Sequence, residues 1–265
     1  MDEELRRRIE ESGYARPGFA ERYERFRPSP PPALLNLLPP LAGVERPALV
    51  VDLGAGTGLS TRIWADRANE VIGVEPNDAM RRVAEQATTA GNVGYLARSA
   101  YDTGLPVGCA DLVTAAQSLQ WMDPKAVFPE IGRILREGGV FCAYQYSTMQ
   151  TPLWEPEQAW QMVRDRMRDL RTRRGPEAAR WPVSTERLEQ SGVFRAVREM
   201  PLHSIEYGDG ERLLGFALSE GSLANLLDEG TPEDEIGLDR LRETVAEMPE
   251  PVPWWVGYQA WVCLR

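Results

Sequence analysis

Between residues 48 and 146 the chain alternates short apolar runs with segments of helical periodicity. The runs are bounded by glycine or polar residues, a pattern typical of buried parallel strands. We predict strands at 48–53, 70–75, 93–97, 110–116 and 140–146. Helices are predicted between them at 59–68, 77–88 and 123–135. This alternation predicts an α/β fold with a doubly wound, mostly parallel sheet that carries helices on both faces.

Outside this region the rhythm changes, and helices dominate. Prolines at positions 28–32 precede a short helical segment at 33–38, and further helices are predicted at 152–174, 185–190, 211–218, 222–227 and 232–248. Two more strands are expected at 194–200 and 253–264, the last one antiparallel. We therefore predict a sheet of seven strands. We divide the chain into four parts: an N-terminal helical lid (1–40), a core (41–146), a helical cap insertion (147–193) and a C-terminal part of the core with further cap helices (194–265).

A glycine-rich loop follows the first predicted strand, in the order Asp52-Leu-Gly-Ala-Gly-Thr-Gly58. Glycines in such a loop permit tight backbone angles and let a ligand approach the main chain. A dinucleotide fingerprint requires glycine or alanine at its sixth position, where this chain has Leu59. The spacing therefore argues against a dinucleotide-dependent oxidoreductase.

Glu75 ends the second predicted strand, a little more than 20 residues after Asp52. A carboxylate at this distance can accept hydrogen bonds from both hydroxyls of a ribose. Two later segments complete the set. Residues 98–102 follow the third predicted strand, and residues 110–121 contain the fourth predicted strand and the turn after it. Together with the glycine loop, these segments resemble the motifs of class I S-adenosylmethionine-dependent methyltransferases, in the type 11 branch that acts on small molecules. The resemblance covers residues 48–146 and implies a Rossmann-like fold.

The resemblance also implies which residues contact S-adenosyl-L-methionine. Pro76 and Met80 would flank the adenine, Ala100 and Tyr101 would contact it after the third strand, and Tyr23 and Arg27 would close over the methionine end. The predicted cofactor-binding residues are Tyr23, Arg27, Asp52, Gly54, Ala55, Gly56, Thr57, Glu75, Pro76, Met80, Ser99, Ala100, Tyr101 and Gln117.

The methyl group of this cofactor is already activated by its sulfonium, so a base is required only if the nucleophile enters protonated. His203 is the only histidine; we place it just past the sixth strand, as a candidate base or a surface residue. Tyr144 and Tyr146 end the fifth strand and are candidates for orienting substrate. The candidate acceptor-lining residues are Gln120, Trp121, Trp154 and Trp160, although core packing accounts for the tryptophans equally well. Relatives often have histidine where Gln120 stands.

Composition and charge limit the classes of partner and ligand that we expect. A formal net charge of -10 disfavours nucleic acid, whose binding requires clustered cations. The arginines between 164 and 174 are interleaved with Asp165 and Asp169, and we interpret them as a solvated helix face. The three cysteines are not closely spaced, so neither a disulfide framework nor a metal site is expected.

The N-terminal residues 1–11 are charged, and no apolar run is long enough to span a membrane, so we expect a cytoplasmic protein without a membrane partner. The predicted function is methyl transfer from S-adenosyl-L-methionine to an O, N or C nucleophile of a small organic acceptor, by in-line displacement that relies on positioning. The alternative is a non-methylating, cyclase-like enzyme that binds the same cofactor. The oligomeric state is left open.

Overall fold

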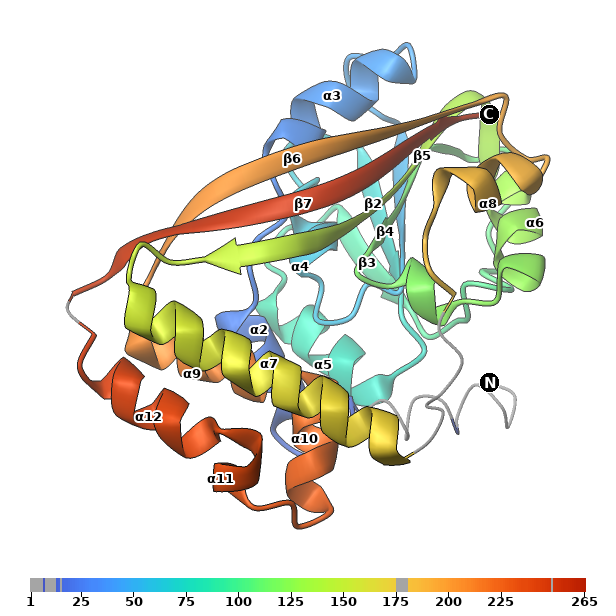
Figure 1. Ribbon diagram of the computed structural model, residues 1–265. Helices are drawn as coiled ribbons and strands as arrows, with labels where there is room; N and C mark the ends of the chain where they lie inside the picture. The colour runs from blue at the N-terminus through green and yellow to red at the C-terminus, as the bar shows by residue number, and fades with distance from the viewer. Residues whose placement is uncertain (1–6, 8–12, 15, 175–180, 249) are drawn as a thin grey trace.

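The computed structural model describes residues 7, 13, 14, 16–174, 181–248 and 250–265, and its sheet has seven strands in the order β3-β2-β1-β4-β5-β7-β6 (Figure 1). Neighbouring strands from β3 to β5 are parallel, whereas β7 is antiparallel to both β5 and β6. The strands are β1 (Leu49–Leu53), β2 (Glu70–Val74), β3 (Val93–Leu96), β4 (Ala110–Ala116), β5 (Leu135–Gln150), β6 (Ala196–Gly208) and β7 (Val252–Leu264). The predicted mostly parallel, seven-stranded Rossmann-like sheet is confirmed.

Both faces of the sheet bury apolar side chains, because successive residues of a strand point to opposite faces. Val50 of β1 belongs to a cluster that includes residues of helix α3, whereas Val51 belongs to a second cluster that includes residues of α6. The helices associated with the sheet are α3 (Ala33–Leu41), α4 (Leu59–Arg62), α5 (Asp78–Ala87), α6 (Pro124–Ile134) and α8 (Thr185–Gln190), with a 3-10 turn η1 at Leu119–Trp121. The sheet is therefore covered on both sides, as in a doubly wound fold.

Strands β5, β6 and β7 are longer than the sequence predicts, and they extend past the parallel strands as an arm (Figure 1). The predicted sixth strand ended before Pro201, because proline cannot donate a hydrogen bond within a sheet. β6 is an edge strand of the sheet, where a missing backbone N–H is tolerated, and it continues through Pro201 to Gly208. The prediction that His203 lies past this strand was therefore wrong.

Five helices pack beneath the arm: α7 (Trp154–Arg174), α9 (Gly210–Leu218), α10 (Gly221–Asp228), α11 (Glu233–Ile236) and α12 (Leu238–Ala246) (Figure 1). Their apolar side chains join those of the sheet in one cluster, which includes Trp160, Phe216 and Leu241. The single helix predicted at 232–248 is broken at Gly237, which has a φ of 83° and ends α11. We refer to these five helices as the cap.

Helix α2 (Phe19–Phe26) packs against α9 of the cap and α5 of the core, so it bridges the two. The predicted lid over residues 1–40 contains this helix, but most of residues 1–11 lie outside the described part of the chain. The boundaries of the four predicted parts stay predictions. Among the described residues, no helix has the length and apolar character needed to cross a membrane.

Candidate functional site

The glycine-rich loop lies at the carboxyl end of β1, next to β4, where the strand order reverses. Ligands bind at this switch point in open α/β sheets. Gly58 has a φ of 83°, and a Cβ atom on it would lie 2.2 Å from the Tyr95 hydroxyl. Gly56 also has positive φ, but a Cβ there would meet only the Met80 methyl, at 3.6 Å. Gly58 thus serves packing, whereas Gly56 leaves the backbone accessible to a ligand.

Asp52 is completely buried at the start of this loop, and its carboxylate is surrounded by hydroxyl donors. Ser60 and Thr61 donate to one oxygen at 2.5 and 2.7 Å, and Thr114 donates to the other at 2.8 Å. Burial raises the pKa of the Asp52 carboxyl, and the three hydroxyls partly oppose that shift. Asp52 therefore ties β1 to α4 and β4, so that it holds the loop in shape from behind.

Glu75 links the glycine loop to the start of α5. Its two carboxylate oxygens accept hydrogen bonds from the backbone N–H of Gly56 and of Asn77, each at 2.8 Å. Asn77 in turn caps α5 by accepting from the N–H of Ala79, which fixes the turn after β2. Burial raises the pKa of the Glu75 carboxyl to about 7, although both backbone donors act in the opposite direction. A ribose hydroxyl that donated to this carboxylate would favour its ionised form.

A pocket of about 50 Å³ lies over the loop, and it is lined by several of the predicted residues. Four buried polar atoms among its lining residues have no hydrogen-bond partner within the described part of the chain: the Thr57 hydroxyl, the Gln117 amide nitrogen, the Tyr144 hydroxyl and the Arg27 Nε. Such atoms are costly to bury and are usually satisfied by a ligand or water. The predicted residues that line the pocket are Tyr23, Arg27, Gly54, Ala55, Gly56, Thr57, Gln117, Tyr144 and Tyr146.

Arg27 closes this pocket from the lid side and holds the lid against the cap. Its guanidinium donates to the Ser219 carbonyl and the Tyr146 hydroxyl and forms an ion pair with Glu220 at 3.0 Å. It also lies over the Tyr23 ring, 4.7 Å from the centroid. Small-molecule sites usually occupy roughly 300–1,000 Å³, so this pocket of about 50 Å³ is smaller than the space that a ligand of nucleoside size fills.

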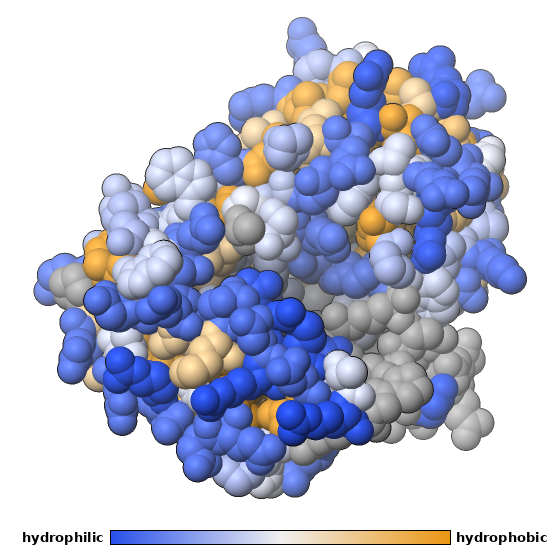
Figure 2. All heavy atoms as spheres, viewed as in Figure 1, coloured by the Kyte–Doolittle hydropathy of each residue, from blue (hydrophilic) through white to orange (hydrophobic). Residues whose placement is uncertain are grey.

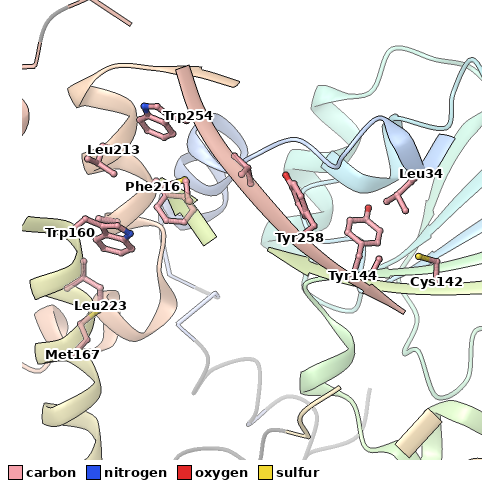
Figure 3. Packing of buried hydrophobic residues seen from close by; sticks show 14 of the residues in the cluster. Leu34, Cys142, Tyr144, Trp160, Met167, Leu213, Phe216, Leu223, Trp254 and Tyr258 are labelled. Atoms are coloured by element: carbon pink, nitrogen blue, oxygen red, sulfur yellow. The ribbon is translucent and has the colours of Figure 1, made fainter. Parts of the chain in front are cut away.

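Three tyrosines from the sheet reach the same pocket. Tyr146 of β5 is paired with Tyr258 of β7, so both side chains lie on one face of the sheet, and Tyr144 shares that face (Figure 3). The Tyr258 hydroxyl donates to the Ser29 carbonyl at 2.5 Å. Burial holds the pKa of the Tyr144 and Tyr146 phenols well above the usual value, so both stay protonated near neutral pH. These phenols can orient a substrate but cannot serve as bases.

Other predicted cofactor contacts lie around the pocket but do not line it. Met80 packs with Ala20 and Tyr23 of α2, directly beneath the lid. The Ser99 hydroxyl accepts from the backbone of Tyr101, whose own hydroxyl accepts from the Asp123 N–H at 2.9 Å. These contacts shape the loop after β3. Besides Ser99, Met80 and Tyr101, the residues outside the pocket lining are Asp52, Glu75, Pro76 and Ala100.

A larger cavity, of about 390 Å³, lies between the end of β5 and helices α7, α9 and α10. We call it the arginine-lined cavity, because Arg164, Arg168 and Arg171 of α7 lie along it. Of the predicted acceptor residues, Trp160 lines it, whereas Trp154 is 68% exposed at the start of α7. Gln120 and Trp121 lie in η1, and the Gln120 amide donates to the Gln117 carbonyl at 2.8 Å.

The structure does not bring His203 to this site. His203 is paired with Gly257 of β7, whereas its neighbour Leu202 is paired with Tyr258. The His203 side chain therefore points to the face of the sheet opposite to Tyr258. There it is exposed and stacks on Trp255, with ring centroids 6.3 Å apart. Within the described residues, no cluster of three histidine, cysteine or carboxylate side chains is placed to hold a metal.

Several lining residues of the smaller pocket escaped the sequence prediction. Leu59 and Ser60 directly follow the glycine loop, so their position in the chain could have indicated them. Ala116 ends β4 next to the predicted Gln117, which is a signal of the same kind. Tyr258, Pro28 and Pro30 gave no such signal, because they reach the pocket only through the pairing of β7 with β5 and the path of the lid.

Comparison with known proteins identifies the domain that carries this site. The family described as "Methyltransferase domain" matches residues 51–143. An uncharacterized methyltransferase of Mycobacterium tuberculosis is 38% identical over 117 residues, which cover 44% of this chain and 46% of the relative. Residues 51–143 of this chain therefore match a class I methyltransferase domain of the type 11 branch. The chain spans about half of the length of the curated relatives that it matches.

Two further similarities agree with the domain and its fold. A probable S-adenosylmethionine-dependent methyltransferase of Saccharomyces cerevisiae is 30% identical over 129 residues, or 47% of this chain and 44% of the relative. A protein of Anaeromyxobacter dehalogenans described as a type II methyltransferase has a similar structure, with a TM-score of 0.65, 24% identity and coverage of 89% and 97% of the two chains. The methyltransferase domain thus contains the glycine loop, Glu75 and Gln117, and S-adenosyl-L-methionine is the cofactor of its family.

Proposed function

We propose that this chain transfers a methyl group from S-adenosyl-L-methionine to a small organic acceptor. The observation that carries the proposal is the pocket over the glycine loop, which is lined by Thr57 and Gln117, whose buried hydroxyl and side-chain amide nitrogen lack partners among the described residues, and by the open backbone at Gly56. These groups suit the polar ends of an amino-acid-substituted nucleoside. The Glu75 carboxylate beside Gly56 suits its ribose.

The protein's contribution would be positioning. When bound beside Gly56, Glu75 and Gln117, the cofactor would supply an activated methyl group on a positively charged sulfur. Holding that methyl group and the nucleophile of the acceptor in line can lower the barrier by several kcal/mol. Tyr144 and Tyr146, near the carboxyl end of the parallel part of β5, would orient the acceptor, and Arg27 with Tyr23 would close the lid over the methionine end of the cofactor.

Direct proton abstraction by the protein is not part of this proposal. The two tyrosines remain protonated because burial raises their pKa, and His203 lies on the other face of the sheet. A nucleophile that carries a proton would lose it to water. The non-methylating alternative is not favoured, because the relatives described above carry methyltransferase names.

Titration calorimetry with S-adenosyl-L-methionine and with its demethylated product tests the cofactor assignment. We expect both to bind, and we expect Glu75→Ala to weaken binding by about tenfold or more, because hydrogen bonds to a carboxylate are among the stronger ones. Glu70→Ala, at the exposed opposite end of β2, is the matched control and should bind normally. If the unaltered protein binds neither compound, the proposal is wrong.

Mass spectrometry tests the transfer itself. Phenols, amines, carboxylates and phosphate-bearing compounds are incubated with the protein and the cofactor, and a product that gains one methyl group is sought. Release of the demethylated cofactor in equal amount is expected. A product formed without a mass gain of one methyl would contradict methyl transfer and revive the cyclase-like alternative.

A further inference from the structure

Three arginines of α7 face the arginine-lined cavity together. Arg164, Arg168 and Arg171 are spaced by four and three residues, which places their side chains on one side of a helix. Figure 2 shows hydrophilic side chains gathered over α7, on the face of the molecule turned to the viewer. The interleaved Asp165 and Asp169 do not line the cavity. The helical spacing therefore places these arginines on the cavity side of α7 and leaves the two aspartates out of the cavity lining.

Among the described residues, the charges of Arg164 and Arg168 are only partly balanced. Glu220 is the one carboxylate among its lining residues, and it forms an ion pair with Arg27, outside the arginine row. Arg168 has an ion pair with Asp165 of its own helix, and Arg171 donates to the Ser222 hydroxyl at 2.8 Å. Burial raises the pKa of the Glu157 carboxyl, whereas the charge of Arg164 acts to lower it, and the described contacts include no hydrogen bond between the two residues. An anion placed here would meet several guanidinium donors at once.

Aromatic side chains also line the cavity. The Trp160 and Phe216 rings meet edge to face with centroids 5.7 Å apart, and Tyr146 meets Phe216 at 6.1 Å. Figure 3 shows Trp160 and Phe216 together on the cap helices, apart from Tyr144 and Tyr258 on the sheet. A cavity lined by both arginine and aromatic side chains suits a small molecule that has an anionic group and an apolar body.

Tyr146 connects the two cavities, because it lines both the arginine-lined cavity and the pocket over the glycine loop. We propose that the acceptor is a small anion, whose carboxylate or phosphate group binds Arg164 and Arg168 while its apolar part lies on Trp160 and Phe216 and extends toward Tyr146. This inference rests on the proposed function, since it names the substrate class of the same site. The negative overall charge of the protein makes such a positive cavity a local, selective feature.

The test measures binding of three aromatic probes of similar size to the protein saturated with the demethylated cofactor product. Phenylacetate and phenyl phosphate carry the two anionic groups, and 2-phenylethanol is the neutral counterpart. Calorimetry should show binding of the anions at least tenfold tighter than that of the alcohol, and added salt should weaken it. The tighter of the two anions identifies the group as carboxylate or phosphate.

Arginine variants locate the binding site. Arg164→Gln and Arg168→Gln should each weaken anion binding by about tenfold, and Arg164→Lys should retain part of it. Arg173→Gln is the matched control, because Arg173 is an exposed arginine of the same helix that does not line the cavity. Thermal unfolding confirms that each variant is folded.

Three results would overturn the inference: equal binding of the alcohol and the anions, an unchanged affinity in both cavity variants, or an equal loss in Arg173→Gln. These outcomes are separable from failure of the proposed function. A protein that binds the demethylated cofactor but not the anions contradicts only the acceptor class, whereas a protein that does not bind the cofactor contradicts the proposed function.

Discussion

The pocket over the glycine loop and the arginine-lined cavity share Tyr146, but their charged groups are held in opposite ways. At the loop, both carboxylates are buried and engaged: Asp52 accepts from three hydroxyls and Glu75 from two backbone N–H groups. In the cavity, the arginines project from the surface of a cap helix. Arg164 and Arg168 are exposed there.

This contrast separates what holds the fold from what selects a ligand. Removing a buried, multiply bonded carboxylate leaves its donors without partners, so the cofactor pocket cannot change without a loss of stability. Exposed helix positions change at little cost. A domain built in this way can keep one cofactor while its cap adapts to different acceptors. The following predictions test that separation, in order of expected effect.

Substitution of Asp52 by alanine should give the largest loss. We expect the free energy of unfolding to fall by roughly 2–4 kcal/mol, because the hydroxyls of Ser60, Thr61 and Thr114 lose their common acceptor. Release of the buried charge offsets part of the cost, as the raised pKa of Asp52 implies. Urea unfolding measures the change. Asp52→Asn, which keeps one amide oxygen, should lose less.

Arg164→Gln provides the comparison in the same assay and should change the free energy of unfolding by less than about 0.5 kcal/mol. Asp66→Ala, an exposed aspartate, controls for the loss of charge alone. If Asp52→Ala and Arg164→Gln destabilise the protein equally, the proposed division between fold and ligand selection is wrong.

Binding of S-adenosyl-L-methionine should depend on pH through Glu75. Ribose hydroxyls that donate to Glu75 require the ionised carboxylate, whose pKa is raised to about 7 by burial. Affinity should therefore be constant above that pH and fall by about tenfold for each unit below it. In Glu75→Gln, the affinity should be lower and this dependence should disappear. A profile that is the same in both proteins would contradict the ribose contact.

The same group affects stability in the opposite direction. Its pKa is higher in the folded protein than the ordinary value of 4.5, so folding favours the protonated carboxyl. The stability contributed by Glu75 is present below pH 4.5 and is lost as pH rises to about 7. The protein without cofactor should thus lose stability from this group over the range in which cofactor affinity increases.

The cofactor half of the molecule was largely predictable because its signals are local in sequence. Gly54, Gly56 and Gly58 stand at every second position of one short loop, and a loop of that spacing has few uses. Glu75 ends the neighbouring strand, so its place beside Gly56 follows from the parallel pairing of β1 and β2. In each case the spacing in sequence determines the spacing in the structure.

The cap side of the molecule, where we propose that the acceptor binds, depends on contacts between distant segments, which a single sequence does not reveal. Tyr258 reaches the pocket only because β7 inserts between β5 and β6, and β6 passes Pro201 only because it becomes an edge strand. Arg164 and Arg168 belong to a run that reads as a solvated helix face. Their side chains reach the cavity because of how α7 packs against the rest of the cap, which includes the contact of Trp160 with Phe216.

The smallest effect is expected for His203→Ala, although His203 is the only histidine of the chain. Its ring stacks on Trp255 on the face of the arm opposite to Tyr146 and Tyr258, so its removal leaves both cavities intact. Calorimetry should give affinities for the cofactor and for phenyl phosphate within about twofold of the unaltered protein. The free energy of unfolding should fall by about 0.5 kcal/mol at most, as for an exposed pair of rings on a sheet. A tenfold change in either affinity would show that the outer face of the arm is coupled to the site, and the assignment of the two faces to separate roles would fail.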